Sequence, residues 1–108
     1  MHKPDYSIVV DATGPDEAVR VAVGGELDLA ASGPLRDALE AQLGAGRDVV
    51  LDLARVEFLD CSGLSAVVAG MEFARARGRL LMIDDNLSEP VRRVADLTST
   101  LDQLLVAA

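Results

Sequence analysis

Cysteine and aromatic residues are scarce in this sequence. Among 108 residues there are one cysteine, one tyrosine, two phenylalanines and no tryptophan. A single cysteine cannot form an internal disulfide, so nothing in the sequence indicates an extracellular, disulfide-stabilised domain. So few rings argue against nucleic-acid binding by base stacking. The hydrophobic core must therefore consist of valine, leucine and alanine.

Positive charge is also limited. Ten lysines and arginines stand against eighteen aspartates and glutamates, which gives a formal net charge of −8 at pH 7. Such a chain repels a phosphate backbone, so we expect no nucleic-acid partner. A protein with a basic surface is the more suitable partner.

Patterns that bind metals, nucleotides or membranes are missing. The one histidine is His2, two acids without a histidine or a third ligand make a poor metal site, and no Gly-x-Gly-x-x-Gly or P-loop spacing occurs. We therefore expect no metal and no cofactor. No apolar run approaches the ~20 residues of a membrane span, and the N-terminus lacks the order of a secretory signal. A cytoplasmic protein without membrane contact is the expectation.

The N-terminal part of the chain predicts a β-hairpin. Tyr6–Asp11 has the composition of a strand, and residues 18–23 alternate in the manner of a half-buried strand. Between them, Thr13-Gly14-Pro15-Asp16 is typical of a turn. We expect these strands to pair antiparallel and to be followed by a tight exit loop at residues 24–28.

A helix and a buried strand are predicted next. Ser32-Gly33-Pro34 offers a capping hydroxyl and then a proline in the first turn, where no N–H is needed. Gly44 and Gly46 predict the end of that helix. Residues 49–53 form a nearly continuous apolar run, which is typical of a central strand covered on both faces.

A second long helix is predicted to start in Asp60-Cys61-Ser62-Gly63-Leu64, after a loop that carries the acid, and to end at Gly78. Residues 80–83 predict another buried strand, and Ser88-Glu89-Pro90 repeats the pattern of cap and proline. Residues 101–106 fit a strand or a helix. The order β-β-α-β-α-β-α predicts an α/β domain with parallel later strands.

Five short segments carry a family resemblance. They are Gly25-Glu26-Leu27-Asp28, residues 34–39, Leu51-Asp52-Leu53, residues 58–64 and residues 91–98. In this order and at this spacing they resemble the STAS domain of bacterial anti-sigma factor antagonists. The resemblance implies a single STAS-type domain over residues 1–108, with a mixed β-sheet, an N-terminal antiparallel hairpin, parallel inner strands and about three to four helices.

The resemblance implies a regulatory binding protein rather than an enzyme. Antagonists of this family bind an anti-sigma factor of the histidine-kinase-like ATPase class and release a sigma factor. The serine that follows the loop acid is phosphorylated by that kinase, and the added charge of about −1.5 to −2 expels the partner. In this chain the acid is Asp60 and the next residue is Cys61.

Three consequences of Cys61 are open. The thiol can abolish phosphorylation and leave a constitutive binder. Ser62 can accept the phosphoryl group instead, although adjacent residues at a helix start point about 100° apart. Cys61 can also act as a redox handle, which the helix N-terminus favours and Asp60 opposes. The structural alternative is a small buried residue that packs under the loop.

We predict that the partner contacts the acid after the second strand and the start of the second long helix: Asp28, Asp60, Cys61, Ser62, Gly63, Leu64 and Ser65. Each type of residue also has a structural explanation. Asp60 or Ser62 can be the helix N-cap, and Asp28 can be a loop acid or the cap of a helix that begins near residue 30. Gly63 can allow the loop itself, rather than a partner, to pack closely.

Two other functions fit the sequence. One is a STAS accessory subunit of a transporter or of a stress-signalling assembly. The other is an enzyme with Cys61 as a thiol nucleophile, which requires rapid alkylation of the native protein. For the protein itself we expect a monomer or a weak homodimer.

Overall fold

The predicted order of strands and helices is confirmed by a computed structural model, which describes residues 5–12 and 18–98. The predicted turn at residues 13–16 and the segment at residues 101–106 lie outside the described residues. The elements are β1 (Tyr6–Asp11), β2 (Ala18–Leu27), α1 (Leu29–Gly44), β3 (Asp48–Leu59), α2 (Cys61–Ala76), β4 (Leu81–Ile83) and α3 (Glu89–Thr98).

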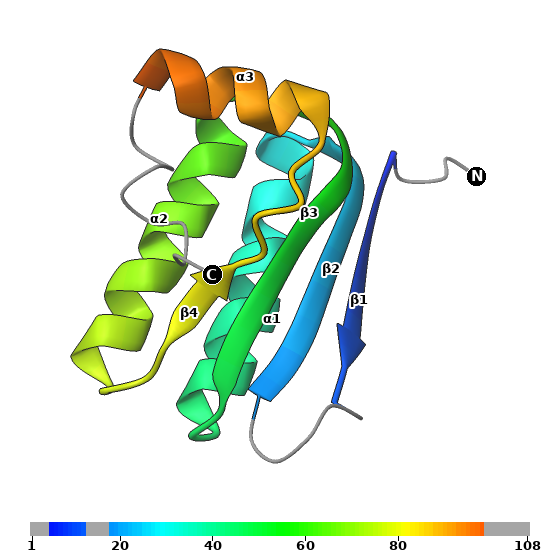
Figure 1. Cartoon of the computed structure of the whole chain (residues 1–108). Helices are drawn as coiled ribbons and strands as arrows, with labels where there is room; N and C mark the ends of the chain where they lie inside the picture. The colour runs from blue at the N-terminus through cyan, green and yellow to red at the C-terminus, as the bar shows by residue number, and fades with distance from the viewer. Residues whose placement is uncertain (1–4, 13–17, 99–108) are drawn as a thin grey trace.

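The strands form one mixed sheet in the order β1-β2-β3-β4. Strand β1 pairs antiparallel with β2, whereas β2 with β3 and β3 with β4 are parallel. Both the N-terminal hairpin and the parallel inner strands are thus confirmed. Helices α1 and α2 lie side by side against one face of the sheet, and α3 crosses its end (Figure 1).

Only one face of the sheet is covered by helices. Val19 and Val21 in β2 are fully buried, whereas Arg20 between them is exposed. In β3, Val49, Leu51 and Leu53 are fully buried, but the intervening residues are only partly covered. The prediction of a strand buried on both faces is therefore wrong. The cause is tertiary, because both long helices pack on the same side and the residues between the buried ones form the open face.

The core is aliphatic, as the composition predicts. Its largest fully buried side chains are all leucine, isoleucine or valine, among them Leu27, Leu35 and Leu51. Full burial of such a side chain contributes roughly 1.5–3 kcal/mol. No charged or polar residue of the described part is buried.

The second strand and the first helix extend beyond their predicted limits. Strand β2 continues to Leu27, so residues 24–27 are strand rather than exit loop. Helix α1 begins at Leu29 because Asp28 caps it, which leaves Pro34 inside the helix and not in its first turn. Ser32 does not cap the helix, since its hydroxyl donates to the Leu29 carbonyl oxygen at 2.9 Å.

The third strand also differs from its prediction. It runs without a loop from Asp48 to Leu59, and its register against β2 shifts twice, once between Ala22 and Gly24 and once between Gly25 and Glu26. At each shift β3 contains one more residue than β2, which is the pattern of a β-bulge. The strand therefore delivers Asp60 directly to the start of α2.

Both helix ends predicted from glycines are confirmed, since α1 ends at Gly44 and α2 at Ala76, two residues before Gly78. Gly46 and Gly78 have φ values of 86° and 67°, which favour glycine, just after α1 and α2. The prediction that the Ser88 hydroxyl caps the third helix is wrong. Ser88 accepts the Arg92 N–H through its backbone carbonyl at 2.9 Å, but its side-chain oxygen is buried and has no hydrogen-bond partner among the described residues.

An ion-pair network ties the open face of the sheet together. Arg20 contacts Asp52 at 3.0 Å and Asp84 at 3.1 Å, and so links β2 to β3 and to the segment after β4. The backbone N–H of Asn86 and the Arg20 guanidinium lower the pKa of Asp84. Among the described helices, none combines the length and the apolar character needed to cross a bilayer.

Candidate functional site

Parallel pairing brings the two predicted acids to one edge of the sheet. Leu27, the last residue of β2, pairs with Leu59, the last residue of β3. Asp28 and Asp60 therefore follow neighbouring strands, and the Asp60 N–H points to the Leu27 carbonyl oxygen at 3.4 Å. Residues that are 32 positions apart in the sequence become neighbours through this register.

Both acids cap a helix. The Asp28 Oδ1 accepts the N–H groups of Ala30 at 3.0 Å and Ala31 at 3.3 Å. The Asp60 Oδ1 accepts the N–H of Gly63 at 3.0 Å. Such caps contribute about 1 kcal/mol each. The structural explanation of both acids is thus confirmed, and it leaves their half-exposed carboxylates available to a partner.

Gly63 is buried between the start of α2 and the ends of two strands. A methyl group at its α-carbon would overlap the Leu27 carbonyl oxygen and would lie 2.7 Å from Leu27 Cγ and 2.8 Å from Leu59 Cδ1. The absence of a side chain therefore allows the first turn of α2 to rest directly on β2. The close packing takes place within the chain, in agreement with the second explanation offered for this glycine.

An open hollow lies between the first turns of α1 and α2. Its volume is about 230 Å³, and it is lined by Leu29, Ser32, Arg36, Ser62, Ser65 and Ala66. Leu29 is 75% exposed. We call this region, residues 28–36 and 60–66, the tip surface.

The predicted site residues on the tip surface differ in their exposure to solvent. Cys61 and Ser65 are exposed, Asp28, Asp60 and Ser62 are partly exposed, and Leu64 is partly buried against the core. The explanation of Cys61 as a buried packing residue is wrong, because the first residue of α2 projects from the sheet edge.

Sequence reasoning missed three residues of this region: Leu29, Ser32 and Arg36. Ser32 was predicted to cap the first helix, and Leu29 and Arg36 were given no role in binding. Asp28 followed by Ala30 and Ala31 was the signal for an earlier start, since an aspartate cap needs free N–H groups two and three residues later.

The surroundings of the tip are acidic. Glu26 lies beside Asp5, Asp28 and Glu57, and its pKa is raised by the negative charge of Asp5, by partial desolvation and by the other two acids. A raised pKa shows that these carboxylates repel one another. The edge therefore presents a negative field to an approaching molecule, with Arg36 as the cation that lines the hollow.

Two nucleophilic side chains lie at the tip. Cys61 offers a thiol and Ser62 a hydroxyl, but no histidine occurs between residues 5 and 98 that could activate either group. The described residues contain no cluster of three histidine, cysteine, aspartate or glutamate side chains that could hold a metal ion.

Comparisons with known proteins agree with this architecture. The family model described as "Mlab, STAS domain" matches residues 10–106. The anti-sigma-B factor antagonist of Bacillus subtilis (strain 168) is 28% identical over 102 residues, which cover 94% of this chain and 93% of that protein.

Solved structures show the same fold. An anti-sigma factor antagonist from Mycobacterium paratuberculosis has a TM-score of 0.75 at 27% identity, over 97% of this chain and 87% of that one. The anti-sigma factor antagonist SpoIIAA in its unphosphorylated form has a TM-score of 0.76 at 24% identity, over 94% of this chain and 88% of its own. Its phosphorylated form, from Bacillus, has a TM-score of 0.71 at 22% identity, over 94% and 91%. The sequence match over residues 10–106 and the shared fold together confirm the resemblance, and this chain belongs to the STAS-domain family.

Proposed function

We propose that this protein is an anti-sigma factor antagonist, a regulatory binding protein and not an enzyme. It binds an anti-sigma factor of the histidine-kinase-like ATPase class through the tip surface and thereby releases a sigma factor. The observation that carries the proposal is the pairing of Leu27 with Leu59, which sets the capped starts of α1 and α2 side by side around an open hollow.

The tip surface has the composition of a protein-binding site. Leu29, which is 75% exposed, lines the tip hollow, and Phe58, which is 48% exposed, lies beside the tip surface near the end of β3. An apolar centre with a charged rim is the usual arrangement of an interface. The negative rim favours a partner with basic residues and accelerates their encounter.

Cys61 makes the proposed binder constitutive. It occupies the position of the family's phosphorylated serine and is exposed, so a kinase would reach it, but phosphoryl transfer depends on placing an attacking oxygen in line. Ser62 is partly exposed and lines the hollow, one residue further along α2. We therefore expect no switch at Cys61 and at most slow transfer to Ser62.

The binding surface is tested with two leucines on opposite edges of the sheet. Leu29→Glu places a charge on the tip surface. Leu80→Glu is the matched control, because Leu80 is also exposed, at 59%, and lies before β4 at the other end of the parallel strands. With the anti-sigma factor recovered by pull-down, calorimetry should show at least a tenfold weaker Kd for Leu29→Glu, or about 1.4 kcal/mol. The control should bind as the wild type does. Equal binding by both variants would show that the tip is not the interface.

Phosphorylation is tested separately. Incubation with the same anti-sigma factor and ATP should leave the wild type almost unmodified by intact mass, and Cys61→Ser should gain one phosphate. Any residual phosphate in the wild type should disappear in Ser62→Ala. Rapid and complete modification of the wild type would contradict a constitutive binder.

The pull-down also discriminates the alternative function. Recovery of a transporter ATPase, a permease subunit or a large assembly of related STAS proteins, in place of an anti-sigma factor, would identify the chain as an accessory subunit. A thiol enzyme has the least support, because the described residues include no histidine that could pair with Cys61.

A further inference from the structure

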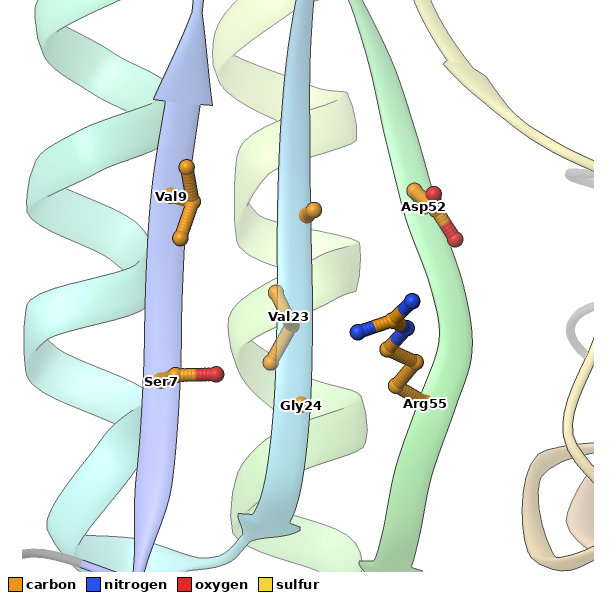
Figure 2. A pocket seen from close by; sticks show the side chains of 7 residues that line it. Ser7, Val9, Val23, Gly24, Asp52 and Arg55 are labelled. Carbon is orange, nitrogen blue, oxygen red and sulfur yellow. The ribbon is translucent and has the colours of Figure 1, made fainter.

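A second hollow lies on the open face of the sheet, away from the helices. It has a volume of about 330 Å³ and is lined by Ser7, Val9, Ala22, Val23, Gly24, Asp52 and Arg55. These residues come from three adjacent strands, β1, β2 and β3 (Figure 2). Its size falls at the lower end of the range of small-molecule sites.

Two local features of the strands create this hollow. Gly24 has no side chain, and a methyl group there would lie 2.9 Å from Ser7 Oγ and 3.6 Å from Arg55 Cβ. The register shift in β3 then sets Arg55, not Ala54, opposite Gly24. The Asp52 Oδ1 stabilises this irregular stretch by accepting the Ala54 N–H at 3.0 Å. A glycine and a bulge at one point of a sheet often mark the close approach of a ligand.

Arg55 is the available charge in this hollow. Its guanidinium extends from β3 toward β2, and the Ser7 hydroxyl points to the same strand from the other side (Figure 2). Within the part of the chain that the structure describes, the Arg55 side chain forms no ion pair or hydrogen bond. Asp52 does not neutralise it, because Asp52 Oδ2 contacts Arg20 and Asp52 Oδ1 accepts the Ala54 N–H.

We propose that this open-face hollow binds a small monocarboxylic acid with an apolar body. The carboxylate contacts the Arg55 guanidinium, which presents a fork of donors suited to it. The apolar body rests on the partly exposed Ala22 and the 58%-exposed side chain of Val9. Ser7 supplies one hydroxyl at the opposite wall.

The charge balance favours a monoanion over a phosphate. Among the described residues, Arg55 is the one cation that lines the hollow, and the nearby Asp52 carboxylate shares Arg20 with Asp84, so Asp52 keeps part of its negative charge. A dianion would leave one charge without a partner and would lie close to Asp52. The exposed valine and alanine surface adds affinity only for a ligand that has apolar area to bury.

Benzoate is a suitable probe, because it joins a single carboxylate to a small apolar ring. In a ¹⁵N–¹H correlation titration of the full chain, millimolar benzoate should shift the amides of Ser7, Ala22, Gly24 and Arg55 saturably. Benzylamine, which has the same ring with a positive charge, should not. Arg55→Gln should weaken benzoate at least tenfold, whereas Arg36→Gln, an arginine of the tip surface, should leave its affinity unchanged.

Gly24→Ala provides a second variant that keeps the charge and fills the hollow. It should also weaken benzoate at least tenfold, while the spectrum stays that of a folded protein. Three results would overturn the proposal: no saturable shift with benzoate, equal shifts with benzylamine, or an unchanged affinity in Arg55→Gln. None of them bears on binding at the tip surface, which is tested by Leu29→Glu.

Discussion

Gly63 is the glycine of the tip surface at which an added methyl group would clash with its neighbours. Replacement by alanine adds a methyl group that overlaps the Leu27 carbonyl oxygen and approaches the side chains of Leu27 and Leu59. A side chain can rotate away, but the carbonyl belongs to the paired end of β2 and cannot. The first turn of α2 must therefore move off the sheet, and Asp60 and Cys61 must move with it.

The magnitude follows from the cost of excess volume in a packed site. Overlap with a backbone oxygen belongs at the upper end of the about 1–3 kcal/mol that overpacking costs, and the higher helix propensity of alanine returns up to ~1 kcal/mol. We expect Gly63→Ala to lower the free energy of unfolding by roughly 1–2 kcal/mol. An unfolding entropy of about 2.1 cal/mol/K per residue over 108 residues then gives a fall in Tm of roughly 4–9 °C.

Gly44 supplies the matched control. It is also a helical glycine, at the end of α1, and a methyl group there would meet only Phe73 Cζ at 4.0 Å. Gly44→Ala should therefore raise stability by about 0.4–1 kcal/mol, since it removes freedom from the unfolded chain without a clash. Thermal and urea unfolding of the two variants should give changes of opposite sign. A neutral or stabilising Gly63→Ala would refute the close contact between α2 and β2, and with it the placement of the tip.

Three further results are expected. Glu26→Gln should raise Tm at pH 7. The pKa of Glu26 is raised on folding, so this carboxyl stabilises the protein only when it is protonated and loses that contribution as the pH rises through its pKa. Melts at pH 4 and pH 7 should show that the gain in Tm from Gln is smaller in acid. Asp84→Asn should lower the free energy of unfolding at pH 7 by less than about 1 kcal/mol, since its partner Arg20 is partly exposed. The pKa of Asp84 is lowered in the folded state, so the difference in stability between variant and wild type should disappear as the pH falls below the usual aspartate range. Native Cys61 should react with a thiol reagent at a rate close to that of the unfolded chain, and protection of the thiol would contradict its exposure.

Elements with strong local patterns were predictable from the sequence. The hairpin strands, the second long helix and its end at Gly78 follow from alternation, helical spacing and glycine, which are all local properties. The acid–thiol–serine start of α2 was equally visible, because an aspartate before small residues is a strong N-cap pattern. The boundaries of β2 and α1 were missed, since Ser32-Gly33-Pro34 and Asp28 compete as helix starts and the free N–H groups after Asp28 decided in its favour.

The sequence by itself determined the α/β order, the aliphatic core and the family, because these depend on residue types and their spacing. Only the tertiary structure decided which residues became neighbours. The register of two parallel strands joined Asp28 to Asp60, the packing of both long helices on one side left a sheet face open, and a bulge directed Arg55 over Gly24. These contacts depend on pairing between distant segments, whose register is set by the packing of the whole chain and not by any local pattern.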